Sequence, residues 1–213
     1  MRKYQNSLLD PEQCVVIIID HEPQMYFGVE SLNRRSIMDN TAGLMKAAKT
    51  FGVPVILTTV TEREFSGKTA KHLTDSYPEL VPIDRTAINC WEDENLKKAV
   101  TATKRNKLIL AGLWTEACIT FPALSMMEDG FEVYVVEDAC GGATRAAHEV
   151  AMSRLTQAGV IPMTWQQVML EFQRDWSNKE TYQAVIDIVK EYSGAYGLGI
   201  EYAESMVPTF SQS

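Results

Sequence analysis

The sequence has little cysteine, histidine and glycine for its length. Its 213 residues include 4 Cys, 3 His and 12 Gly. Four cysteines are too few for a disulfide framework, and a chain of this length buries roughly 70% of its unfolded surface without cross-links. We therefore expect free thiols, a reducing compartment and a cytoplasmic location.

Long apolar runs and basic patches are also absent. No apolar stretch approaches the roughly 20 residues that a membrane-spanning helix needs, and no apolar segment follows the basic residues at the N-terminus as in a secretory signal. The chain carries 20 Lys+Arg against 28 Asp+Glu, a net charge of −8. A polyanion is bound by clustered Lys and Arg, so we expect neither a membrane nor a nucleic acid as partner.

The sequence lacks the short motifs that hold metals and nucleotides. The spacings CxxC, HxxxH and HExxH do not occur, and neither GxGxxG nor GxxxxGK[ST] follows an apolar run. We therefore expect no metal site and no cofactor.

Short runs of consecutive apolar residues dominate the rest of the sequence. They are typical of strands buried on both faces and lie at 14–19, 53–60, 107–112 and 131–139, with a fifth expected at 160–163. Helical spacing is found at 44–51, 96–103, 144–158, 166–173 and 180–192. Alternating strands and helices predict an α/β fold: a three-layer α/β/α sandwich with a doubly wound, Rossmann-like, mainly parallel sheet.

Two stretches show no clear period. Residues 61–91 form the longest irregular segment, and such segments in compact domains are usually lids or binding loops. The segment from about residue 193 mixes glycine, aromatic and polar residues, and we interpret it as a C-terminal tail, disordered or packed on a partner subunit. We predict one domain over residues 1–213.

Ligands of parallel sheets bind at the carboxyl ends of the strands, which draws attention to Asp20 and Cys118. Cys118 opens an apolar helix, where the helix dipole favours a nucleophilic thiolate, although a buried packing thiol is the more common role. Asp20 suits a general base, or an ion pair with a distant arginine. Cys140 also ends a strand, and we interpret it as a packing thiol.

Several segments in fixed order carry a resemblance to a known family. VVIIIDHEPQM, ILTTVTE, IDRTAINCWEDE and LILAGLWTEACITFPALSMMEDGFEVYVVEDACG resemble the isochorismatase-like cysteine hydrolase superfamily, over about residues 14–176. The chain is most similar to its YcaC-like bacterial branch. The resemblance implies the sandwich fold expected above, a catalytic Asp at Asp20 and a nucleophilic Cys at Cys118.

The resemblance also assigns residues around the nucleophile. The family signature Gly-x-x-Thr-x-x-Cys corresponds to Gly112, Thr115 and Cys118, and a cis peptide bond before that Thr is expected at Trp114–Thr115. Trp114 and Thr115 are therefore expected to bind substrate and its oxyanion. The family lysine corresponds to Arg85, which keeps its proton and acts as a fixed charge.

By this resemblance we expect a cysteine-dependent hydrolase of a small amide or related C–N substrate. The Asp-x-His metal site of nicotinamidases is missing, which argues against that activity. The alternative is a non-catalytic homo-oligomeric binding or assembly protein with the same fold, favoured by the arginine in place of lysine. In either case members of this branch imply a homo-oligomer, an octamer in the closest cases.

Overall fold

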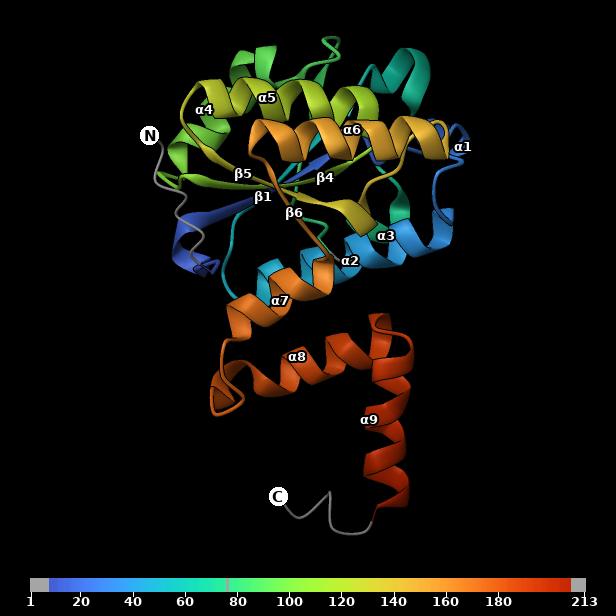
Figure 1. The fold of residues 1–213 in the computed structure, drawn as a ribbon, viewed down its shortest axis with the longest axis vertical. Coiled ribbons are helices and arrows are strands. Elements are labelled where there is room, and N and C mark those ends of the chain that lie inside the picture. The colour runs from blue at the N-terminus through green and yellow to red at the C-terminus, as the bar shows by residue number, and fades with distance from the viewer. Residues whose placement is uncertain (1–7, 76, 208–213) are drawn as a thin grey trace.

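A six-stranded parallel sheet forms the centre of the protein. The computed structural model describes residues 8–75 and 77–207, and its sheet has the strand order β3-β2-β1-β4-β5-β6 (Figure 1). The strands are β1 (Cys14–Ile19), β2 (Val55–Val60), β3 (Ile83–Arg85), β4 (Lys107–Gly112), β5 (Glu132–Val136) and β6 (Ile161–Met163). The doubly wound, parallel α/β fold predicted from the apolar runs is confirmed.

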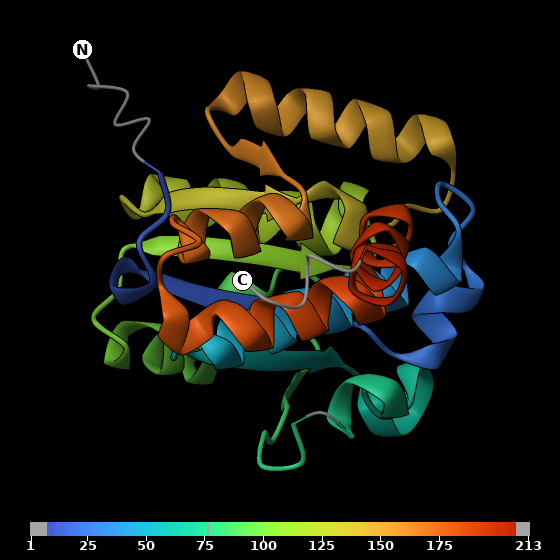
Figure 2. The same cartoon turned by 90° about the horizontal axis from the view of Figure 1, so that it is seen from below.

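Helices cover both faces of this sheet. Figures 1 and 2 show one layer with α4 (Glu94–Ala102), α5 (Thr120–Glu128) and α6 (Arg145–Ala158), and an opposite layer with α2 (Arg34–Thr50) and α7 (Trp165–Gln173). Helix α8 (Lys179–Tyr192) packs on α2 and α7, on their side away from the sheet (Figure 1). Two short helices, α1 (Pro23–Phe27) and α3 (Lys71–Thr74), lie in connections beyond the strand ends. No helix of the described chain combines the length and apolar character needed to cross a membrane.

The central strands are buried on both faces, as their unbroken apolar sequences indicate. Every residue of β1 and of β4 is buried, and the core divides into one apolar cluster on each side of the sheet. The two strands pair in register from Cys14 opposite Lys107 to Ile19 opposite Gly112. This pairing brings the carboxyl ends of β1 and β4 side by side at one edge of the sheet.

Three segments differ from the sequence-based expectation. Edge strand β3 lies within the segment that was expected to be irregular. The sequence did not reveal this strand because only one of its three residues is apolar. The run 131–139 ends its strand at Val136 and continues as a short 3-10 helix, Glu137–Ala139. The tail expected to be irregular contains helix α9 (Ala195–Met206), which projects away from the sheet (Figure 1); residues 208–213 of that tail lie outside the described chain.

Gly112 is required where β4 approaches β1. A Cβ atom at this position would lie 2.4 Å from the Ile19 carbonyl oxygen and 2.8 Å from the Ile19 Cβ. Both atoms belong to a buried strand that cannot move away without breaking the sheet. The glycine therefore sets the spacing of the two strand ends that lead into Asp20 and Cys118.

We expect Gly112→Ala to lower the free energy of unfolding by about 1–3 kcal/mol, the usual cost of overpacking a core. Chemical denaturation measures the loss. Gly199→Ala is the matched control, because a Cβ at this helical position meets nothing within 4 Å and alanine favours helix. Equal stability of the two variants would show that β4 is not held this close to β1.

Candidate active site at the ends of β1, β3 and β4

Three functional side chains predicted from the sequence meet at one edge of the sheet. Asp20 follows β1, Arg85 is the last residue of β3, and Cys118 lies in the five-residue π-helical turn Thr115–Ile119 after β4. Strand order reverses between β1 and β4, and such switch points are where doubly wound sheets bind ligands. The topology thus places Asp20 and Cys118 on either side of the usual binding crevice.

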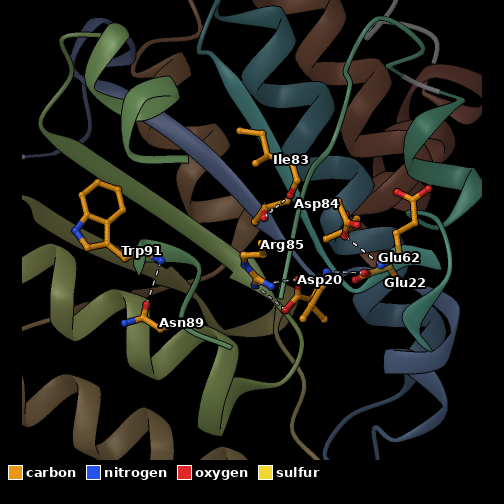
Figure 3. A network of polar contacts seen from close by, with 11 residues as sticks. Asp20, Glu22, Glu62, Ile83, Asp84, Arg85, Asn89 and Trp91 are labelled. Atoms are coloured by element: carbon orange, nitrogen blue, oxygen red, sulfur yellow. Dashed lines mark hydrogen bonds and ion pairs between the residues drawn. The ribbon is translucent and has the colours of Figure 1, made fainter. Parts of the chain in front are cut away.

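Asp20 and Arg85 form a buried ion pair. One guanidinium nitrogen, Arg85 Nη2, donates to Asp20 Oδ1 at 3.0 Å and to Oδ2 at 2.9 Å, and the two side chains are 0% and 1% exposed (Figure 3). The Arg85 Nε and Nη1 are buried without an oxygen acceptor. Taking two charges out of water is costly, and mutual attraction offsets this cost only while both partners remain.

The backbone of Asp20 has an uncommon conformation. Its φ angle is +56°, in the left-handed region, and its N–H donates to the Thr58 carbonyl at 3.0 Å. A non-glycine residue held there is strained by on the order of 1–3 kcal/mol. Aspartate tolerates the region better than most residues, and the conformation turns its carboxylate toward Arg85.

Burial raises the pKa of Asp20 to about 6, against the opposing effects of the Arg85 charge and of hydrogen bonds from Arg85 and Cys118. Asp84 adds a smaller raising effect. The carboxylate is therefore mostly ionised at pH 7, and its pKa is closer to 7 than the pKa of a surface aspartate. Such a group can accept and return a proton within one reaction cycle.

The Cys118 thiol is 5% exposed and lies within electrostatic reach of the Asp20 carboxylate. Burial, followed by the charge and hydrogen bond of Asp20, raises the pKa of this thiol, whereas the Trp114 backbone N–H and Arg85 lower it. The expectation of a thiolate at a helix N-terminus is therefore wrong for the unliganded protein. Cys118 lies inside a short turn, and the charge with the largest effect on its pKa is the negative charge of Asp20.

Trp114 and Thr115, which were expected to hold an oxyanion, have a different arrangement in the structure. The cis peptide bond is Leu113–Trp114, one bond earlier than expected. The Thr115 N–H donates to the Gly141 carbonyl at 3.0 Å, and the Thr115 hydroxyl contacts His148 Nδ1 at 2.8 Å. Thr115 thus serves to fix the turn, and the donor directed at Cys118 is the Trp114 N–H.

Sequence reasoning missed two residues of this site. Cys90, in the segment 61–91 that the sequence left irregular, is buried within electrostatic reach of the Arg85 guanidinium, and burial raises the pKa of its thiol to about 12. Glu22 is fully buried, and its Oε1 accepts a hydrogen bond from the Val60 N–H at 2.9 Å. In the sequence, the only signal was that Glu22 lies two residues after Asp20. Cys140 is buried in the core as expected.

The three predicted catalytic side chains lie beneath the surface. A hollow of about 420 Å³ is lined by Glu62, whose backbone N–H donates to Asp84 Oδ1 at 3.0 Å beside Arg85. A larger hollow of about 610 Å³ runs along α7, and none of the three predicted catalytic side chains lines it. Within residues 8–75 and 77–207, no three His, Cys, Asp or Glu side chains converge as a metal site.

The comparisons with known proteins point to one family and one fold. The family model described as the isochorismatase domain matches residues 14–167. The probable hydrolase YcaC of Escherichia coli is 39% identical over 171 residues, covering 80% of this chain and 82% of that protein. A structure of YcaC from Pseudomonas aeruginosa with hexane-2,5-diol and covalent acrylamide has a TM-score of 0.90 and 32% identity, covering 95% and 100% of the two chains.

A second similar structure is that of the Escherichia coli YcaC gene product. Its TM-score is 0.90 at 33% identity, covering 97% of this chain and all of the other, and it is described as an octameric hydrolase of unknown specificity.

We expect Arg85→Gln to lower the free energy of unfolding by about 3–5 kcal/mol, because it leaves the Asp20 carboxylate buried without a cation. Urea unfolding of Arg85→Gln, Asp20→Asn and the double variant measures this. The double variant should lose less than the sum of the single losses.

A surface pair provides the control for this cycle. Lys71 and Asp75 are 2.6 Å apart, and their side chains are 85% and 60% exposed, so Lys71→Gln should cost no more than about 1 kcal/mol. If the loss of unfolding free energy in the double variant equals the sum of the two single losses, the charges of Asp20 and Arg85 do not compensate each other.

Proposed function

Because this chain belongs to the isochorismatase family and has a YcaC-like hydrolase fold, we propose that it is a cysteine-dependent hydrolase of a small amide or related C–N substrate. The placement of the buried Cys118 thiol next to the Asp20 carboxylate, at the switch point of the sheet, carries this assignment. It joins a nucleophile to a base of suitable pKa. The structure of YcaC from Pseudomonas aeruginosa contains covalent acrylamide, which alkylates nucleophiles through its alkene, and this supports a reactive nucleophile in that relative.

The first half of the reaction forms a thioester. Asp20 takes the thiol proton as the Cys118 sulfur attacks the carbonyl carbon, and the C=O electron pair moves to oxygen. The Trp114 N–H and the Arg85 charge stabilise this oxyanion. When the electron pair returns, the C–N bond breaks, and the Asp20 proton passes to the leaving nitrogen.

The second half restores the thiol. Asp20, again ionised, takes a proton from water, and the resulting hydroxide attacks the thioester carbon. The C–S bond breaks and the sulfur recovers its proton from Asp20, so a carboxylic acid leaves and Cys118 is ready for another cycle. Arg85 stays protonated throughout, because a guanidinium does not exchange its proton near neutral pH.

A homo-oligomer and a reducing compartment complete this proposal. Helix α9 exposes Leu198, Tyr202 and Met206, each more than 60% accessible, and the Escherichia coli YcaC gene product is described as octameric. An apolar helix face of this kind fits contact with further copies of the chain. All four cysteines are free thiols, as expected for a protein of the cytoplasm.

We expect iodoacetamide to label Cys118 faster than the other three cysteines, at a rate that rises through about pH 6 as Asp20 ionises. Asp20→Asn should remove this rise and slow labelling by roughly 10²–10⁴-fold, the usual contribution of a general base. Mass spectrometry after timed quenching locates and quantifies the label.

Turnover of a small-amide library provides the matching functional readout. Cys118→Ser and Cys118→Ala should remain folded and lose turnover, measured as released ammonia or amine. Turnover retained without the thiol would disprove the nucleophile, and slow labelling spread over all four cysteines would favour the non-catalytic binding or assembly protein.

Light scattering of the purified chain should give a mass several times that of one subunit, with eight subunits as the expected number. Replacing exposed apolar side chains of α9, as in Leu198→Glu with Tyr202→Glu, should reduce this mass because a charge cannot be buried unpaired in an interface. A monomeric wild-type protein would contradict the expected assembly.

A further inference from the structure

Glu22 is a buried acid that the proposed reaction does not use. It precedes α1 at the N-cap position, yet its side chain makes no capping hydrogen bond and turns inward instead. Its Oε1 accepts the Val60 N–H, whereas its Oε2 is buried and has no hydrogen-bond partner. Figure 3 shows the Glu22 carboxyl group directed toward the Asp20–Arg85 pair.

The charges around Glu22 decide its protonation. Asp20, Arg85 and Asp84 are the charged groups that act on it, from the ends of β1 and β3. Burial and the Asp20 charge raise the pKa of Glu22 to about 9, and the Val60 N–H and Arg85 oppose the rise only in part. Glu22 is therefore a neutral carboxylic acid at pH 7.

The position of the proton on this acid follows from the hydrogen bonds. Because Oε1 accepts from Val60, the proton resides on Oε2, which makes Oε2 a hydrogen-bond donor with no acceptor. A buried donor without an acceptor is destabilising, so native structures seldom retain one without a role. Here the donor faces the carboxylate and guanidinium of the candidate catalytic pair.

We propose that the Glu22 carboxyl group binds the substrate, by donating a hydrogen bond from Oε2 to an uncharged oxygen or nitrogen acceptor of a small neutral amide. This inference rests on the proposed function, because it assigns a substrate group to the same site. Asp20 and Asp84 make the surroundings of Glu22 acidic, which disfavours a substrate carboxylate there. The preferred substrate is accordingly a neutral amide and not the salt of an acid.

Binding without chemistry tests this proposal. The Cys118→Ser variant prevents turnover, and ligand-observed NMR measures its affinity for propionamide, an unreactive neutral amide, and for propionate, its anionic counterpart. We expect propionamide to bind more tightly than propionate at pH 7. We also expect its Kd to rise about tenfold from pH 7 to pH 10, as Glu22 ionises and the donor is lost.

Variants of Glu22 in the Cys118→Ser background provide the control. Glu22→Gln keeps a donor and an acceptor at the same places, so its Kd for propionamide should not change between pH 7 and pH 10. Glu22→Leu removes both and should weaken binding at either pH. Tighter binding of propionate, or the same rise in Kd with pH in Glu22→Gln, would overturn the proposal.

A stability measurement is independent of any ligand. A carboxyl group whose pKa is raised on folding destabilises the folded state increasingly as pH rises from its unfolded pKa toward about 9. The melting temperature of Glu22→Gln should therefore exceed that of the wild type by an amount that grows from pH 6 to pH 9. A constant difference would show that Glu22 is already ionised and would overturn the proposal. If Cys118 of the wild type proves unreactive in the labelling experiment while propionamide still binds as expected, only the proposed hydrolase activity is rejected.

Discussion

The buried ion pair between Asp20 and Arg85 is the interaction on which the rest of the site depends. It connects the end of β1 to the end of β3 across β2, which separates them in the sheet. Strand β3 has only three residues, and its pairing with β2 brings Arg85 opposite Val60. The short edge strand thus holds the arginine in place, and the ion pair in turn fixes the carboxylate that contacts Cys118.

This pair also explains why the thiol stays protonated in the absence of substrate. Burial and the charge of Asp20 outweigh the effect of Arg85, so little positive potential is left to stabilise a thiolate at Cys118. In the proposed reaction, the proton leaves the thiol only when a carbonyl carbon is present to receive the sulfur electrons. Because thiolates are the form that oxidants attack, a protonated resting thiol is also less exposed to irreversible oxidation.

The sequence was informative wherever burial leaves a local pattern. Strands β1 and β4 followed from unbroken apolar runs, and the parallel sheet predicted that Asp20 and Cys118 share one edge. Strand β3 was missed because two of its three residues are polar, and α9 because Gly194, Gly197 and Gly199 obscure its helical spacing. The family resemblance, and not the pattern of residues, pointed to Arg85.

The remaining features of the site depend on contacts that no local pattern encodes. Cys90 meets Arg85 and Glu22 meets the Val60 N–H only after distant segments have packed together. The protonation of Asp20, Glu22 and Cys118 is set by that packing, so a prediction from the position of Cys118 at the start of a helix gave the wrong direction for the thiol.

The left-handed backbone of Asp20 limits how this protein can vary in evolution. Glutamate would supply the same functional group, but its longer side chain gains none of the local stabilisation that lets aspartate and asparagine adopt this conformation. The two acids are therefore not interchangeable at this position, although they are adjacent in the genetic code. The main chain thus favours aspartate over glutamate as the acid at this position, independently of the chemistry that the acid performs.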